Sequence, residues 1–289
     1  MTPADFGALS EALRRATVSV ASGQRGRGSG VVWSADGLIL TNSHVLGGGP
    51  PVVELWDGRR LPARIELRDS HADLAALRVD AGGGLPAPLY RDSDDVRPGE
   101  LAIAVGNPLG FSGALTRGVV HAVGPLRGLG RRPWIQADIQ LAPGNSGGPL
   151  ADAGGRVIGL NTMIAGGVGL AIPSARIARF LSHGPAPRLG VTVRPTLLRI
   201  GGEDRLGLAV LEVETSSPAQ SAGVRRGDII VAAEGRPLET LEDLSEAFVA
   251  REEGTIEALR GEGSRSRRET LHIRLPVRRS MTARAAEAA

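Results

Sequence analysis

The stretch Gly144-Asn145-Ser146-Gly147-Gly148-Pro149-Leu150 places one serine among small residues, with Pro143 directly before it. Glycine lets the backbone take conformations closed to other residues and lets a substrate come close. Such a loop can present a hydroxyl nucleophile beside backbone N–H groups aimed at one point, which are two parts of an acyl-transfer site. The alternative is a glycine-rich turn between two strands. The rest of the chain must therefore supply a base and an acid that orients it.

Composition bounds both the fold and the chemistry. The chain has 289 residues, of which 42% are hydrophobic and 3% aromatic, so it can hold two domains with aliphatic cores. Its 41 glycines and 19 prolines fall between short apolar runs, which is typical of many short strands joined by turns. We therefore predict a mainly all-β fold. The absence of cysteine excludes disulfides, thiolate metal sites and a cysteine nucleophile.

Charge and targeting signals are weak. The formal net charge is +3, and all basic residues apart from histidine are arginine. The arginines at 265–268 and 278–279 have Glu262 and Glu269 nearby and no aromatic residues for stacking, so a nucleic-acid partner is not expected. Residues 1–21 lack the basic start and apolar centre of a signal peptide, and no window is long enough to span a membrane. The sequence as given predicts a cytoplasmic protein; the cell envelope is the alternative if the true N-terminus is longer.

The order of elements suggests two β-rich domains. Residues 4–15 have helical spacing, and short β-like runs begin at Ala16. Residues 173–181 predict a closing helix, and residues 183–187 form a short, stiff linker. The predicted organisation is an N-terminal segment over 1–15, a first domain over 16–183, a second over 184–277 and a tail over 278–289.

Two polar residues upstream of the serine are candidates for the base and the orienting acid. His44 follows the predicted strand 38–41, and Asp73 stands at the entry of the apolar strand that follows it. A lone histidine is more often structural than catalytic, but a carboxylate at a strand entry needs a partner, and an imidazole N–H is a suitable one. His71 and Asp73 could suggest a metal site, but no third ligand lies at suitable spacing. We therefore expect no metal.

Three motifs in this order resemble the signatures of the HtrA-type, trypsin-like serine proteases. They are Thr41-Asn42-Ser43-His44-Val45, Asp73-Leu74-Ala75 and Pro143-Gly144-Asn145-Ser146-Gly147-Gly148-Pro149-Leu150. Gly169-Leu170-Ala171-Ile172-Pro173-Ser174 resembles the strand and helix that follow the active site in that family. The resemblance implies a trypsin-like double β-barrel that works without a cofactor.

The resemblance also implies a role for each residue. Ser146 is the nucleophile, His44 is the general base and then the acid, and Asp73 orients the imidazole. Gly144, Asn145 and Ser146 make the oxyanion hole; Gly144 and Ser146 supply the N–H groups, while Asn145 shapes the loop. Asn145 cannot form the ion pair that an aspartate makes with a newly cut N-terminus in digestive relatives. Activation by loop ordering is therefore expected.

Some positions bear on specificity or depart from the family pattern. Gln140 replaces the acid that favours Lys or Arg at the cut site, and the hairpin Leu160–Ile172 is apolar with small residues. We therefore expect small or medium aliphatic side chains beside the scissile bond. Ala142 and Ser43 each stand where asparagine is frequent in the family, which concerns the fine geometry of both loops.

The second domain resembles the PDZ domains attached to these proteases. Arg188-Leu189-Gly190-Val191 is similar to their carboxylate-binding loop, although Arg188 occupies a position that is often aromatic. Ser217–Ile230 is similar to their Pro-Ala…Gly-Asp segment. Such a groove takes a peptide C-terminus as an added strand beside a helix, here predicted at Leu238–Ala250. The alternative is a structural β unit that only packs on the protease.

The sequence thus predicts a serine endopeptidase of HtrA type that cleaves unfolded or misfolded proteins, with a PDZ domain that binds peptide C-termini. The resemblance further implies a homotrimer assembled through the N-terminal segment. Two alternatives stay open: a catalytically dormant peptide-binding chaperone or scaffold, and a non-proteolytic β-rich adaptor.

Overall fold

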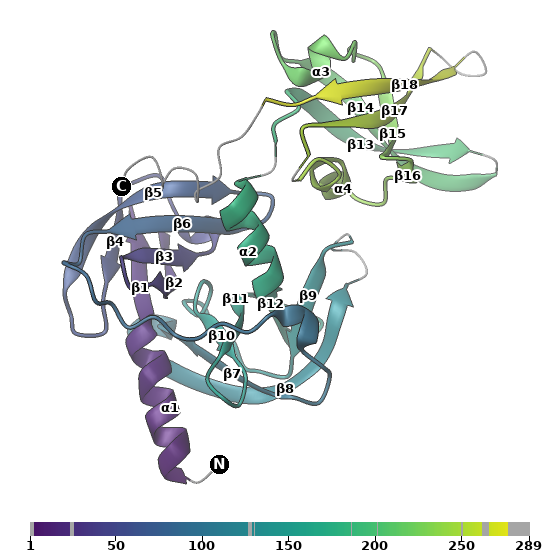
Figure 1. The fold of residues 1–289 in the computed structure, drawn as a ribbon. Helices are drawn as coiled ribbons and strands as arrows, with labels where there is room; N and C mark the ends of the chain where they lie inside the picture. Colours follow the sequence, from purple (N-terminus) through teal and green to yellow (C-terminus); the bar gives the residue numbers. More distant parts are fainter. Residues whose placement is uncertain are drawn as a thin grey trace. The chain divides into compact units, whose positions relative to one another are not determined.

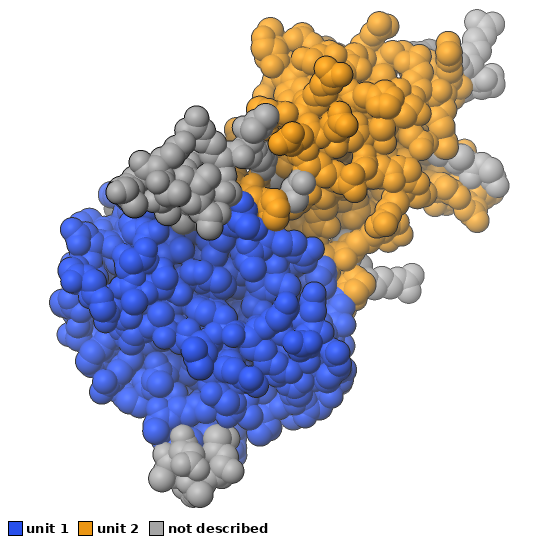
Figure 2. Space-filling view, in the orientation of Figure 1, with its two compact units in different colours: residues 1–124, 133–182 blue, residues 125–132, 183–289 orange. Residues whose placement is uncertain are grey.

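The computed structural model describes residues 3–276, except 24–25, 127–128, 130, 186, 201, 250 and 262–265. The predicted tail at 278–289, with Arg278 and Arg279, lies outside the described residues, as does Arg265. The chain divides into two compact units, shown in Figure 2. The first unit holds residues 1–124 and 133–182, and the second holds 125–132 and 183–289. Strands predominate in both units, so the mainly all-β fold class is confirmed.

The first unit contains two closed six-stranded barrels (Figure 1). The first barrel has the strand order β1-β2-β3-β6-β5-β4. Its strands are β1 (Thr17–Ser22), β2 (Gly26–Ser34), β3 (Leu38–Thr41), β4 (Pro51–Glu54), β5 (Arg60–Asp69) and β6 (Leu74–Val79). Alternate side chains of a strand point into a barrel, and here they are almost all Val, Leu, Ile and Ala, such as Val20, Ile39 and Leu77.

The second barrel has the strand order β10-β11-β12-β9-β8-β7. Its strands are β7 (Leu101–Gly106), β8 (Ala114–Pro125), β9 (Pro133–Ala137), β10 (Pro149–Ala151), β11 (Val157–Ala165) and β12 (Val168–Pro173). Its core is again aliphatic, with Ile135, Leu150 and Ile158 fully buried. The predicted double β-barrel is therefore confirmed.

Two helices flank the barrels. Helix α1 (Pro3–Ala16) covers the predicted residues 4–15, and its Leu13 is 1% exposed among Val105, Ala151 and Val157 of the second barrel. The N-terminal helix is thus part of the core of the first unit. Helix α2 (Ser174–His183) follows β12 and buries Ile177 and Phe180, in agreement with the predicted closing helix.

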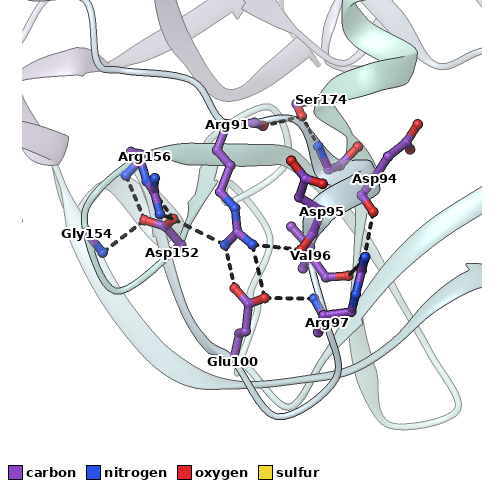
Figure 3. Close-up of polar contacts among 11 residues, drawn as sticks. Arg91, Asp94, Asp95, Val96, Arg97, Glu100, Asp152, Gly154, Arg156 and Ser174 are labelled. Atoms are coloured by element: carbon purple, nitrogen blue, oxygen red, sulfur yellow. Dashed lines mark hydrogen bonds and ion pairs between the residues drawn. The ribbon is translucent and has the colours of Figure 1, made fainter.

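The connection between the barrels is held by the charged cluster in Figure 3. The Arg91 guanidinium binds both carboxylate oxygens of Glu100, one at 3.1 Å, and lies 3.4 Å from the buried Asp152. Arg156 donates to the same Asp152 at 2.7 Å. The Arg91 carbonyl accepts a hydrogen bond of 2.6 Å from Ser174, the first residue of α2. The connection is therefore tied to the second barrel by both its side chain and its backbone.

The second unit is a sheet in the order β13-β14-β15-β17-β18, with β16 paired to β15. Its elements are β13 (Val191–Ile200), β14 (Glu203–Val213), α3 (Pro218–Ser221), β15 (Ile229–Ala233), β16 (Arg236–Pro237), α4 (Leu241–Glu246), β17 (Glu253–Arg260) and β18 (Arg267–Arg274). The core includes Leu189, Leu244 and Phe248. Among the described strands, β13 pairs with β14 alone and is an edge strand.

The predicted helix Leu238–Ala250 is too long. It begins later because the Leu238 N–H pairs with the Val231 carbonyl and Asp243 accepts the Thr240 N–H at 2.9 Å, which caps the helix. It ends earlier because the last turn tightens: Phe248 N–H bonds three residues back and its ring is fully buried. Tertiary packing of one aromatic side chain thus ends the helix that its apolar spacing would extend.

Candidate active site

His44 lies in a short 3-10 turn, η1 (Ser43–Val45), that follows β3 directly. Arg68 of β5 holds this turn: its guanidinium donates to the Ser43 hydroxyl at 2.9 Å and to the Ser43 and Leu46 carbonyls at 3.0 and 2.9 Å. The backbone of Ser43 is thereby fixed, while the His44 side chain stays 51% exposed. The turn therefore holds the His44 backbone in place and leaves the imidazole accessible.

Asp73 precedes β6 and faces this imidazole. Its backbone is left-handed, with φ +54°, which is uncommon outside glycine. Both carboxylate oxygens lie 2.9 Å from His44 Nδ1, and Oδ1 also accepts the His44 N–H at 3.1 Å. Because a carboxylate only accepts, Nδ1 carries the proton and Nε2 is left as the acceptor. The pair therefore holds the tautomer that a general base requires.

Asp73 has a third donor that the sequence analysis did not identify. The Thr162 hydroxyl, on β11 of the second barrel, donates to Asp73 Oδ2 at 2.8 Å. The Asp73 side chain is only 17% exposed, so its charge depends on these donors for stabilisation. The bond to Asp73 raises the pKa of His44 above its ordinary 6.5, and burial opposes this only in part.

Ser146 stands in the loop before β10. Gly144 has φ +105° and Gly147 has φ +87°, and a Cβ at either position would lie within 2.6 Å of backbone oxygen. The Ser146 hydroxyl donates to the Thr162 carbonyl at 2.7 Å. Within the described residues, no hydrogen bond joins it to His44. Thr162 thus bonds to both Ser146 and Asp73, and Asp73 bonds to His44, while the serine hydroxyl donates to the Thr162 carbonyl and not to the base.

The loop amides divide into two groups. The N–H of Asn145 donates to the Ala142 carbonyl at 3.0 Å, and that of Gly147 donates to Asn161 at 2.8 Å. The N–H groups of Gly144 and Ser146 donate to no group in the described part of the chain. The N–H groups of Gly144 and Ser146 are therefore available to a substrate oxygen. Asn145 is buried, and its N–H is used within the loop.

Ser29 of β2 fastens this loop, and sequence reasoning missed it. Its buried hydroxyl donates to the Gly144 carbonyl at 2.6 Å, and its N–H donates to the Ser146 carbonyl at 2.8 Å. The Asn107 N–H in turn donates to the Ser29 hydroxyl at 2.8 Å. The sequence signal for this contact is the run of small residues Gly28-Ser29-Gly30. Small residues are required there because another chain segment packs closely: a Cβ at Gly28 would lie 2.9 Å from the Ser146 carbonyl oxygen.

The metal alternative has no geometric support in the described residues. They contain no group of three His, Cys, Asp or Glu placed to hold a metal ion. The N–H groups of His71 and Ala72 both donate to Asp69 Oδ1 at 2.9 Å, so that carboxylate holds the turn before Asp73.

In the second unit, the predicted carboxylate-binding loop precedes the edge strand β13. Arg188 is exposed and Leu189 is packed in the core. The carbonyls of Leu189 and Gly190 accept from Ala219 and Glu214 at 2.9 and 2.8 Å. Gly190 has φ +76°, and a Cβ there would lie 2.2 Å from the Ser217 side chain. Within the described residues the N–H groups of Leu189 and Gly190 have no acceptor, which leaves them available to an anion.

Comparison with known sequences agrees with both units. Residues 28–160 match the family model of the trypsin-like peptidase domain, and residues 187–260 match that of the PDZ domain. The chain is 38% identical over 248 residues to a probable periplasmic serine endoprotease DegP-like of Chlamydia trachomatis, covering 79% of this chain and 50% of the relative. It is 36% identical over 265 residues to serine protease HTRA3 of Homo sapiens, covering 81% and 58%. The chain thus spans about half the length of these curated relatives.

Solved structures agree with the fold. The HtrA-type protease AlgW with a decapeptide superposes with a TM-score of 0.70 at 27% identity, covering 95% of this chain and 99% of that one. In the part of the chain that the structure describes, no helix is long and apolar enough to cross a membrane. The two matched domains, their order and the full-length structural likeness show that the chain belongs to the HtrA-type serine proteases, with a trypsin-like peptidase domain followed by a PDZ domain.

Proposed function

We propose that this chain is a serine endopeptidase that cleaves unfolded or misfolded proteins, with Ser146, His44 and Asp73 as its catalytic residues. The observation that carries the proposal is the Asp73 carboxylate, which lies 2.9 Å from His44 Nδ1 and frees Nε2 to act as a base. Ser146 lies in the same site, bonded to the backbone of the residue whose hydroxyl binds Asp73.

In the proposed reaction the Ser146 hydroxyl turns from the Thr162 carbonyl to His44 Nε2. His44 takes the proton as the serine oxygen bonds to the substrate carbonyl carbon, and Asp73 stabilises the imidazolium. The N–H groups of Gly144 and Ser146 stabilise the oxyanion. His44 then gives the proton to the leaving amine as the peptide bond breaks. A water, deprotonated by His44, releases the acyl group and restores the serine.

The test compares the full chain with Ser146→Ala on casein, followed by gel electrophoresis and mass spectrometry. We expect new peptides with wild type and none with Ser146→Ala. A matched control is Ser182→Ala, which removes a hydroxyl that donates to Ala178 within helix α2, and it should cleave like wild type. Equal casein loss with Ser146→Ala would remove this serine from the mechanism. Suppressed aggregation without new peptides would favour the dormant chaperone.

The proposal includes a preference for small or medium aliphatic side chains before the scissile bond. Gln140 is exposed and carries no charge, so it cannot attract Lys or Arg. A Cβ at Gly169 would lie 2.6 Å from Ile139 and 3.2 Å from Leu141, so apolar side chains crowd this strand. A peptide panel should be cleaved faster after Val or Ala than after Arg; the reverse order would overturn this preference.

The second unit is proposed to bind peptide C-termini at Arg188-Leu189-Gly190-Val191, beside the free edge of β13. The N–H groups of Leu189 and Gly190, which have no acceptor within the described residues, support this assignment, because a terminal carboxylate needs such donors. AlgW, a structural relative, is described with a decapeptide and with a tripeptide. Fluorescence anisotropy should show that free-acid peptides from a degenerate C-terminal library bind and their C-terminal amides do not. Equal binding of both forms would indicate that the loop does not hold the carboxylate.

The homotrimer and the compartment stay predictions. Phe6 and Leu9 of α1 pack with Leu13 against the chain's own core, which uses part of the apolar face that a trimer would need. Multi-angle light scattering on the full chain, with and without a C-terminal peptide, measures the assembly. The Chlamydia relative is named periplasmic. Cell fractionation would distinguish the cytoplasmic expectation from the cell-envelope alternative.

A further inference from the structure

A polar cleft lies beside the Ser146 loop. It has a volume of about 400 Å³ and is lined on one side by Pro143, Gly144 and Asn107. Its other side is a face of the first barrel that includes Arg27, Glu54 and Arg60. Polar and charged groups therefore meet directly next to the proposed oxyanion donor.

The register of β2 explains why an arginine lies there. Side chains two residues apart on a strand share a face, so Arg27 projects on the same side as Ser29. Ser29 binds the Gly144 carbonyl at 2.6 Å. The Arg27 backbone is therefore about 7 Å along the strand from the residue that holds the loop. The long arginine side chain fills the next position of the cleft.

The charge of the cleft is unbalanced. Arg60 and Glu54 face each other on paired strands and form an ion pair of 2.8 Å. Arg27 is exposed, and within the described residues it forms no ion pair with a carboxylate. Arg27 therefore contributes a free positive charge, and its guanidinium is shaped to bind a carboxylate.

The cleft lies on the side from which the leaving group departs. His44 must donate its proton to the leaving amine, so the departing chain lies on the His44 side of Ser146. A Cβ at Gly28 would lie 2.6 Å from Val45, the neighbour of His44, and 2.9 Å from the Ser146 carbonyl oxygen. Gly28 thus fills the space between these two loops, and it lines the same cleft as Arg27.

We propose that this cleft is a subsite for the part of the substrate that follows the scissile bond, and that Arg27 selects Asp or Glu within its first three residues. Three extended residues span about 10 Å, and the cleft begins at Gly144, two positions before Ser146. The inference rests on the proposed endopeptidase activity and names a substrate class for it.

The experiment profiles cleavage sites by mass spectrometry in a peptide library made from a digested proteome, so that no preferred sequence is assumed. Full-length wild type, Arg27→Glu, Arg117→Glu and Ser146→Ala are compared. Wild type should enrich Asp and Glu about threefold at one of the first three positions after the cut, as expected for one partly exposed ion pair. Arg27→Glu should shift the ratio of acidic to basic residues there by about tenfold, and about 1 M salt should abolish the wild-type preference.

Arg117→Glu is the matched control, because Arg117 is exposed on β8, has no described ion pair and does not line the cleft. It changes the net charge equally and should keep the wild-type profile. Cuts that depend on Ser146 but show no acidic enrichment overturn the subsite and leave the protease intact. An identical shift in both arginine variants also overturns it. Absence of any cut that depends on Ser146 overturns the proposed function and the subsite together.

Discussion

The Ser146 hydroxyl donates to the Thr162 carbonyl at 2.7 Å, while the Thr162 hydroxyl donates to Asp73 at 2.8 Å. One residue of β11 therefore contacts both ends of the proposed triad. It orients the acid through its side chain and holds the resting nucleophile through its backbone. A β-bulge between Asn161 and Met163 interrupts the pairing of β11 with β12 at this residue.

Thr162→Val should lower kcat/KM about tenfold, because a hydrogen bond to a charged group is lost while the backbone carbonyl stays. It should also raise the pKa of His44 further, since the Asp73 charge is then shared with one donor fewer. Steady-state kinetics and an NMR titration of the His44 ring measure the two effects. Thr162→Ser keeps the hydroxyl and should restore both values; a Ser variant as slow as Val would assign the loss to packing.

The pH dependence of kcat/KM should follow His44. Its pKa is raised above 6.5 by Asp73, so activity should rise with pH through a value above 6.5. The stabilising contribution of the protonated His44–Asp73 pair has the opposite dependence. It is fully present below pH 6.5 and is lost as pH rises through the raised pKa.

Asp73→Asn should move the rising limb of that profile to lower pH, because the charge that raises the pKa of His44 is removed. It should also reduce kcat by roughly 10⁴, because the amide can hold His44 in the tautomer that has its proton on Nε2. Kinetics over pH 5–9, roughly the range in which histidine titrates, measure both changes. An unchanged rising limb in this variant would show that another group controls it.

Ser29→Ala should reduce kcat about tenfold with little change in KM, because the Gly144 peptide loses the bond that fixes its direction. It should also cost about 2 kcal/mol of stability, since half-buried groups of Asn107 and Gly144 lose their partner.

Ser22→Ala is the matched control for Ser29→Ala. Ser22 is equally buried in the same barrel, and its hydroxyl donates to the Gly49 carbonyl at 2.6 Å. It should lose similar stability in urea denaturation and keep wild-type kcat. If both variants lose activity in proportion to stability, Ser29 has no positioning role.

Arg91→Met should lower the free energy of unfolding of the first unit by about 2–3 kcal/mol, because Asp152 is 4% exposed and loses one of two cations. Its melting temperature in calorimetry should fall by about 5–10 °C. Arg64→Met, which breaks an ion pair that leaves Arg64 76% exposed, should change stability by less than about 1 kcal/mol.

The Arg91 variant also has a pH signature. The bond from Arg91 lowers the pKa of Glu100 below its ordinary 4.5, so the pair stabilises the fold above pH 4.5 and the gain is lost as pH falls through the lowered value. The stability difference between wild type and Arg91→Met should therefore shrink in acid. A difference that is constant down to pH 3, roughly a unit below, would mean that packing alone explains the loss.

The sequence by itself determined the elements and the chemistry that recurs in fixed patterns. Period-two aliphatic runs broken by Gly and Pro specified the barrels, because a strand exposes alternate side chains to one core. The motifs around His44, Asp73 and Ser146 identified the family, since each requires particular residues at neighbouring positions. Helix α4 was overestimated because apolar spacing does not reveal where Phe248 enters the core.

Only the tertiary structure decided which residues support those motifs. Ser29 and Thr162 lie 117 and 16 positions from Ser146, and Arg68 lies 24 positions from His44, so nothing in local spacing links them. Their roles depend on hydrogen bonds of 2.6–3.0 Å from strand residues to distant loops and turns, and the bonds of Ser29 and Thr162 run from one barrel to a loop of the other. The tertiary structure likewise bonds the Ser146 hydroxyl to the Thr162 carbonyl and brings Arg27 and Gly144 to the same cleft. Directional contacts of this kind depend on the position of the backbone in space, which residue order alone does not specify.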